Sequence, residues 1–502
     1  MASKTLHVEL NALDHLPPPN YSNAILYLPL RAGVSAETAF KHLQQGLQRT
    51  FMQLPWLDGK VYPISPRLPG TPRFLEIRYH EKREDRYLPQ QLRFNELKSL
   101  ETYEDLRESA FHPASYEDES LTWAPFLPDV TDGAEVVVAQ ANFLPGACIL
   151  TAAVSHASSD GMGVFSVLKI WADNCRDLQL GVPPEKAQPP EISDRSLLER
   201  ICTSEGTGRS VEQIPPETWR LLGLEPPLNG EAAAAAAVTN GLSQSGQPPP
   251  PVSSGSGRSL QPYIFYMSPT KVTDLRDECK KETGATDVSV NDVICALVWR
   301  GLLKARIAAR GSHGGGLMNG DNPADAHNID ARLDLPFDVR PYFSQILPLN
   351  YLGNFTMINQ ALLPLSELVA PLTSIGSVAG RIRQVAAEVT PASLMDAYTL
   401  VKTIQEGLKL GNLKVDGNGL MITSLLAFPM TEVCFGETIF GNGGKPEAIR
   451  TLMGAINQVF RYCVILPKKS HGGVEFVANL FDEEMDILKQ DEAFGRYAMF
   501  VA

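Results

Sequence analysis

Long apolar runs are missing from this 502-residue sequence. Its most apolar stretch, residues 136–154, is interrupted by Gln140 and by Pro145–Gly146, so it predicts two strands joined by a turn and excludes a membrane span. The first twenty residues lack the apolar core of about 7–15 residues that a signal peptide needs. We therefore expect a cytoplasmic protein that does not act at a membrane.

Cysteine and positive charge are also in short supply. The seven cysteines are scattered and form no CxxC or Cys/His ligand pattern, which predicts free thiols and no metal site. A net charge of −13 argues against nucleic acid as a partner. No glycine-rich phosphate loop occurs, so a nucleoside triphosphate is not implied.

What remains is the composition of a globular protein, with 44% hydrophobic and 20% charged residues. The length predicts two domains of about 200 residues each. Residues 225–258 combine an alanine tract with Pro, Gly and Ser, which predicts a flexible linker between a domain over 1–224 and a second over 259–502. The low-complexity segment 311–328 predicts a long surface loop.

Both predicted domains mix strands with helices, which indicates an α/β (α+β) fold with a cleft between the domains. Ser289 and Asp292 are spaced like a capping box at the start of one helix. The expected strands are Ala24–Leu28, Ala147–Val154 and Pro262–Met267, with others near Val433, Val464 and Phe476; the expected helices are Ala36–Leu47, Thr270–Glu282 and Ser289–Arg310.

The string His156-Ala-Ser-Ser-Asp160-Gly161 carries the strongest functional signal. It follows an apolar run and precedes a run of helical period, so it places His156 at the end of a buried strand and Asp160 at the start of a helix. An imidazole with a pKa near 6.5, held at a strand end beside a cleft, suits general base catalysis. The alternative is a structural histidine, and the string alone leaves both possibilities open.

Further motifs accompany the histidine motif along the chain. They are Leu10–Asp14, Leu54–Gly59, Val288–Arg306, Asp338–Asn354, Thr423–Gly436 and Leu480–Asp491. These segments occur in the same order as in the BAHD acyltransferases, and the chain resembles that family, in particular its fungal, trichothecene acetyltransferase-like branch. The resemblance covers most of both halves, without the linker and the 311–328 loop.

The resemblance implies two similar chloramphenicol-acetyltransferase-like domains with the active site at their interface. It implies transfer of an acyl group from acyl-CoA to a hydroxyl of a terpenoid, alkaloid or polyketide. Acetyl is the acyl group expected first. His156 would act as base and then as acid in a direct ternary complex. Acetyl-CoA is then a co-substrate, no cofactor is permanently bound, and the expected state is a monomer.

The resemblance also assigns supporting roles within the site. Asp160 is expected to pair with Arg340 and so fix the loop that carries the histidine. Thr423 falls on the position expected to donate to the oxyanion. Gly161 and Asn354 are expected to support the site structurally.

Coenzyme A carries phosphates, so an acidic protein needs local positive charge to bind it. Arg300, Lys304 and Arg306 lie on one predicted helix and are the first candidates. Lys445 and Arg450 form a second group. The alternative is an ordinary solvated helix face.

The sequence departs from the family pattern in one region. Residues 434–438 are Cys-Phe-Gly-Glu-Thr where the family has DFGWG, and Leu425 stands where it has tryptophan. Because the family's DFGWG element is structural, we expect the change to affect packing more than chemistry. The missing tryptophan would alter the shape of the acceptor site.

Three alternatives to a CoA-dependent enzyme remain. A condensation-type enzyme takes its acyl group from a carrier-protein thioester, but such enzymes show HHxxxDG, and here Ser155 precedes His156. A chloramphenicol-acetyltransferase-like trimer has a shorter chain with the motif near its end. A non-catalytic binding protein could use the same cleft.

Overall fold

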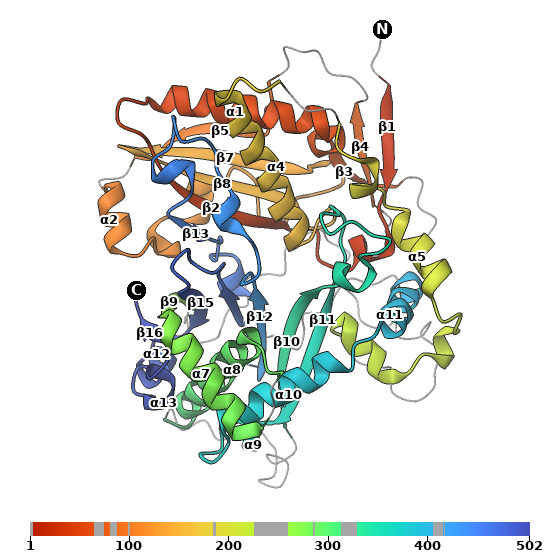
Figure 1. The fold of residues 1–502 in the computed structure, drawn as a ribbon, viewed down its shortest axis with the longest axis vertical. Helices are drawn as coiled ribbons and strands as arrows, with labels where there is room; N and C mark the ends of the chain where they lie inside the picture. The colour runs from red at the N-terminus through yellow and green to blue at the C-terminus, as the bar shows by residue number, and fades with distance from the viewer. Residues whose placement is uncertain are drawn as a thin grey trace.

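The computed structural model describes residues 4–64, 75–80, 88–98, 101–183, 187–224, 260–284, 287–312, 329–404, 415 and 417–502. The predicted linker 225–258 lies outside these residues, as does 313–328 of the predicted loop. The described chain forms two halves, one above the other in Figure 1, each built on a sheet with helices against it. This confirms the predicted mixed fold of each half.

The N-terminal half is built on a five-stranded sheet. Its order is β13 (Ala448–Arg450), β2 (Tyr21–Pro29), β8 (Ala147–Ser155), β7 (Val137–Leu144) and β5 (Leu92–Glu96). Helices α1 (Ala36–Gln53) and α4 (Gly161–Gln179) pack on one face, as Figure 1 shows. A four-stranded sheet lies beside it, in the order β1 (Thr5–Glu9), β4 (Leu75–His80), β3 (Lys60–Pro63) and β6 (Ala134–Glu135).

The C-terminal half is built on a seven-stranded sheet. Its order is β11 (Thr356–Pro364), β10 (Asp330–Asp338), β12 (Gly419–Ser424), β14 (Tyr462–Ile465), β15 (Val474–Leu480), β9 (Gln261–Met267) and β16 (Met499–Phe500). Its core packs against α7 (Pro269–Thr283), α8 (Val290–Ser312), α10 (Ile375–Ala387) and α12 (Asp482–Leu488). The other helices are α2 (Tyr103–Glu108), α3 (Asp118–Leu121), α5 (Leu197–Glu205), α9 (Leu365–Val369), α11 (Pro391–Ile404) and α13 (Glu492–Gly495).

A segment of the C-terminal half crosses into the N-terminal half. Strand β13 pairs with β2 in antiparallel register, and Phe435 and Phe440 are buried in the N-terminal core. The predicted domain boundaries 1–224 and 259–502 stay predictions. They did not include the packing of this C-terminal segment in the N-terminal half. The crossing joins the two halves on one side of the interface.

Most predicted elements are confirmed. The turn between β7 and β8 falls at Pro145–Gly146, and Ser289 and Asp292 form the capping box, with each backbone N–H donating to the other side chain. Helix α1 begins at Ala36 as predicted and runs six residues beyond the predicted end, to Gln53. The strand expected near Val433 is wrong, because that residue ends a short 3-10 turn over Met430–Glu432. Among the described residues, no helix combines the length and apolar character that crossing a bilayer requires.

Candidate active site

His156 directly follows Ser155, the last residue of β8, which is the central strand of the five-stranded sheet. Its backbone N–H donates to the carbonyl of Asn20 at 2.8 Å, and the N–H groups of Ser158 and Ser159 donate to the carbonyl of Ser155. These bonds close a tight loop over residues 155–159, which we call the His156 loop. The catalytic candidate is therefore held by the backbone of a buried strand.

The imidazole of His156 is partly buried. No other described residue hydrogen-bonds its buried Nδ1, and the ring interacts instead with its own backbone carbonyl. Burial lowers the pKa of His156, while this carbonyl and the carboxylate of Asp160 oppose the lowering. A neutral imidazole at neutral pH is the form that a general base requires.

Asp160 caps α4, and both oxygens of its carboxylate accept hydrogen bonds from other residues of the protein. It is 1% exposed, and its carboxylate accepts from the N–H groups of Gly163 (3.0 Å) and Phe355 (2.7 Å) and from the Thr356 hydroxyl (2.9 Å). The guanidinium of Arg340 completes the set with bonds of 2.9 and 3.0 Å. Burial raises the pKa of Asp160, but Arg340 and the other donors outweigh it and hold the pKa below its ordinary value.

The pair between Asp160 and Arg340 that the resemblance implies is thus formed, across the two halves. Arg340, which is 0% exposed, also donates to the carbonyls of Tyr351 (3.0 Å) and Gly353 (2.7 Å) and to Asp338 (2.7 Å). Asn354 donates from Nδ2 to the carbonyl of the catalytic candidate at 2.8 Å. This geometry fixes the His156 loop and leaves Asp160 no free oxygen for a substrate.

The glycine that the site requires is Gly163. A Cβ on Gly163 would lie 2.7 Å from the backbone oxygen of Leu352 and 2.0 Å from Oγ of Ser159, whereas a Cβ on Gly161 would make an ordinary 3.6 Å contact with the ring of Phe428. The first turn of α4 can approach the Leu352 segment because position 163 has no side chain. The close backbone approach therefore occurs at Gly163, and structural support of the site by Gly161 stays a prediction.

A matched pair of variants tests this difference. We expect Gly163→Ala to cost about 1–3 kcal/mol of unfolding free energy through overpacking and to lower kcat by displacing the loop. Gly161→Ala should change stability by less than about 1 kcal/mol. Chemical denaturation of both variants measures the contrast, and equal stabilities would contradict it.

The predicted CoA-binding arginines are corrected by the structure. Arg306 is 1% exposed and donates to the carbonyls of Gly417 (2.7 Å) and Gly419 (3.1 Å). Arg300 is also buried and donates to the carbonyl of Ala370. Residues 292–303 of helix α8 are all buried, so Arg300 and Arg306 reach internal carbonyls.

The other basic candidates differ in exposure. Lys304 pairs with Asp491 at 2.6 Å, and Arg450 is buried against the carbonyls of Ala110 and Phe111. Lys445 is exposed and the side chain of Lys304 is partly exposed, so phosphate binding by these two lysines stays a prediction.

Thr423 lies near the end of β12, half-buried, beside Val464 of β14. Its hydroxyl contacts Tyr462, whose pKa burial raises to about 12 while this contact lowers it. No hydrogen bond among the described residues links Thr423 to the His156 loop. Its role as oxyanion donor therefore stays a prediction.

The altered family element lies at the opposite end of α4 from His156. Phe435 is buried and meets Trp171 edge to face, with ring centroids 5.8 Å apart. Gly436 has a φ of 109° and no room for a Cβ beside Gln179, the last residue of α4. Because a 19-residue helix is about 28 Å long, this element packs the helix far from the site.

Sequence reasoning missed a second buried ion pair, between Asp14 and Arg195. Nη1 of Arg195 lies 3.2 Å from Oδ1 of Asp14, and Oδ1 also accepts from Nδ2 of Asn354 at 2.9 Å. A charged residue three positions after Asn11 signals a capping box, but nothing local indicates its long-range partner.

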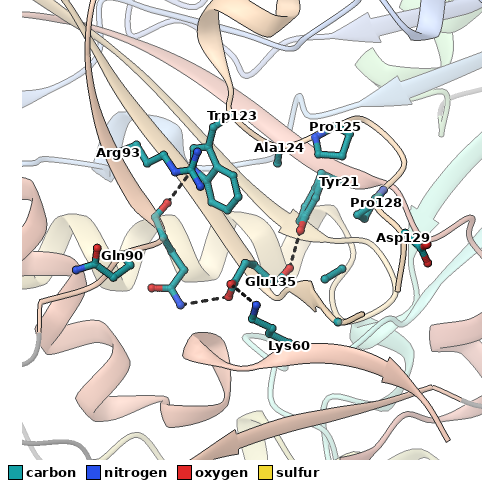
Figure 2. A pocket seen from close by; sticks show the side chains of 13 residues that line it. Tyr21, Lys60, Gln90, Arg93, Trp123, Ala124, Pro125, Pro128, Asp129 and Glu135 are labelled. Carbon is teal, nitrogen blue, oxygen red and sulfur yellow. Dashed lines mark hydrogen bonds and ion pairs between the residues drawn. The ribbon is translucent and has the colours of Figure 1, made fainter. Parts of the chain in front are cut away.

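A cavity of about 370 Å³ lies on the face of the N-terminal sheet away from α4 (Figure 2). Arg93 stacks over the ring of Trp123 at 3.9 Å, and Lys60 pairs with Glu135 at 3.0 Å. None of the predicted site residues lines this cavity. Among the described residues, no cluster of His, Cys, Asp and Glu could hold a metal ion.

Two family models match the chain. The Transferase family matches residues 114–494, and the trichothecene 3-O-acetyltransferase-like N-terminal domain matches 21–175. The isocyanide synthase-NRPS hybrid crmA of Aspergillus fumigatus is 32% identical over 98% of this chain and 31% of its own length. The enoyl-CoA isomerase/hydratase claC of Penicillium crustosum is 25% identical over 98% of this chain and 50% of its own. The chain thus spans about a third and a half of these two relatives.

A third relative matches along its whole length. Trichothecene 3-O-acetyltransferase TRI101 of Fusarium sporotrichioides is 23% identical over 100% of this chain and 98% of its own. Its crystal structure with coenzyme A and T-2 has a TM-score of 0.71 at 19% identity, covering 99% of this chain and 100% of that one. The two-domain fold implied by the resemblance is confirmed. With a family model matched over most of its length and the motifs in order, the chain belongs to the Transferase family, the BAHD acyltransferases.

Proposed function

We propose that the protein is an acyl-CoA-dependent O-acyltransferase that transfers an acetyl group to a hydroxyl of a specialised metabolite such as a terpenoid, alkaloid or polyketide. The observation that carries this proposal is the partly buried imidazole of His156 at a strand end, on a loop braced by the Asp160–Arg340 pair. The names of relatives, a trichothecene 3-O-acetyltransferase among them, support the class of donor and acceptor. We also propose that the protein is a monomer and that it lies in the cytoplasm. The seven free cysteines are consistent with that compartment.

The chemistry requires one base that returns its proton. The imidazole of His156 takes the proton of the acceptor hydroxyl as that oxygen attacks the thioester carbonyl. The tetrahedral intermediate carries its negative charge on the former carbonyl oxygen, toward which we assign the Thr423 hydroxyl as donor. Collapse breaks the carbon–sulfur bond, and the imidazolium protonates the departing thiolate. No covalent acyl-enzyme is needed, because a thioester is already activated.

Thiol release tests the proposal directly. Wild type and His156→Ala are assayed with a panel of acyl-CoAs, with and without pooled hydroxylated metabolites. Acceptor-dependent thiol release that the substitution abolishes supports the proposal and identifies the donor. Release by both proteins alike contradicts it.

A carrier-protein thioester is the second candidate donor. Two observations favour it: a relative named as an NRPS hybrid contains a region like this chain within a longer protein, and Arg300 and Arg306 are occupied internally. This donor would be identified by acyl transfer from an acylated phosphopantetheinyl carrier protein together with no thiol release from any CoA ester.

The pH dependence of kcat/KM provides a further prediction. Burial lowers the pKa of His156 from its ordinary 6.5, and the base works only when neutral. We therefore expect the acid limb of the profile to have its midpoint below pH 6.5, so that activity persists in mildly acidic buffer. Thiol release measured between about pH 5 and 8 checks this, and a midpoint above 6.5 would contradict it.

A further inference from the structure

The buried pair of Asp14 and Arg195 forms a second brace on the His156 loop. Asp14 belongs to a 3-10 turn over Ala12–His15, and Arg195 precedes α5. They are 0% and 7% exposed, and Nη1 of Arg195 lies 3.2 and 3.3 Å from the two carboxylate oxygens. Burying two charges is costly unless each is paired and hydrogen-bonded, so their partners indicate what the pair holds.

Both members of the pair reach the loop. Nη2 of Arg195 donates to the carbonyl of Ser158 at 2.7 Å. Oδ1 of Asp14 accepts from the backbone N–H of Asn354 at 3.0 Å and from its Nδ2 at 2.9 Å. The same Nδ2 donates to the carbonyl of His156 at 2.8 Å. Two carbonyls of the loop are therefore held by one charged unit.

Three separate sequence motifs meet at Arg195. Asp14 comes from the Asn-Ala-Leu-Asp motif near the N-terminus. Trp56, from the Leu-Pro-Trp-Leu-Asp-Gly motif, presents its ring 5.2 Å from the guanidinium carbon. Gly353, which precedes Asn354, leaves room for the guanidinium, because a Cβ there would lie 2.4 Å from Nη1. The arginine is thus preorganised by all three.

We propose that Arg195 and Asp14 are positioning residues for the acyl transfer, acting through Asn354 to fix the carbonyl and ring of His156. The carbonyl and the ring belong to the same residue, and the carbonyl is held by Asn354, so a displaced carbonyl also moves the ring from its working position. This proposal rests on the proposed function, in which His156 is the base. A misplacement of about 1 Å costs up to about 100-fold in rate.

The chain offers a matched control. Arg461, which directly precedes β14, and Glu484 of α12 form another buried pair in the C-terminal half, with bonds of 2.6 and 2.9 Å. Arg195→Met and Arg461→Met each leave one carboxylate buried without its guanidinium, so both should destabilise the fold to a similar extent. Only Arg195→Met should lower kcat, by about 10- to 100-fold, with KM for acetyl-CoA within about threefold of wild type. Arg195→Lys keeps the charge but loses the bridge, and should recover only part of the loss.

A titration of the His156 ring separates positioning from a purely structural role. The charged groups packed around the His156 loop are Asp14, Asp160, Asp338, Arg195 and Arg340. The carboxylate of Asp14 favours the protonated ring, so Asp14→Asn should move the titration of His156 and the acid limb of kcat/KM to lower pH. Carbon-labelled histidine NMR follows the ring, assigned by the signal that His156→Ala removes.

The outcomes are distinct. Unchanged kcat in folded Arg195→Met, an equal loss in Arg461→Met, or an unmoved titration in Asp14→Asn overturns the positioning role. If His156→Ala keeps wild-type turnover, the proposed function itself fails. If His156→Ala has no turnover and Arg195→Met keeps wild-type turnover, only the positioning role is overturned and the proposed function stands.

Discussion

Replacing His156 by alanine is expected to lower kcat by about 10²- to 10⁴-fold, the usual contribution of a general base. No other described residue hydrogen-bonds the buried Nδ1 of this ring, and the backbone bonds that close the loop do not need the side chain. We therefore expect the variant to fold with a stability close to that of wild type. Thiol release, together with circular dichroism and denaturant titration, measures both quantities.

His42 provides the matched control for this prediction. It is also a buried histidine, and its Nε2 lies 2.8 Å from the carbonyl of Phe435, near the other end of α4. His42→Ala should lose stability and keep kcat, the reverse of His156→Ala. A binding protein on this fold would show no turnover to lose, and its ligand affinity would survive the substitution of His156.

Replacing Arg340 by methionine is expected to give the largest loss of stability, about 3–5 kcal/mol, because it leaves the buried carboxylate of Asp160 without its guanidinium and also removes the partner of the half-buried Asp338. The substitution removes one of the ties between the two halves and one of the two braces of the His156 loop, so kcat should fall as well. Urea unfolding measures the stability. The exposed pair of Arg200 and Asp194 is the control, since Arg200→Met should cost less than about 1 kcal/mol.

The effect of Arg340→Met should depend on pH. In the wild type Arg340 holds the pKa of Asp160 below its ordinary value, so this carboxylate stabilises the fold at neutral pH and loses that contribution as pH falls. Without Arg340, burial raises the pKa of Asp160, and protonation relieves the unpaired charge. The stability gap between variant and wild type should therefore narrow from pH 7.5 to pH 5.5, and a gap that widens contradicts the account.

Local patterns in the sequence predicted the strand end at His156, the helix that starts after Asp160 and the capping box at Ser289. These features depend on apolar periodicity and on residues within a few positions of one another. The failed strand near Val433 shows the limit of such patterns, because an apolar residue in a loop can be buried by a segment from another domain. Here that residue packs in the N-terminal core.

The sequence by itself determined the local elements, the family and the candidate base. Only the tertiary structure decided which charges are buried and what they hold. The basic residues of α8 looked available for phosphate, yet Arg300 and Arg306 reach internal carbonyls, and Asp14 and Arg195 meet across 181 positions. Periodicity records the faces of one element, whereas the partner of a buried charge depends on how two halves pack, and that packing creates the site around His156.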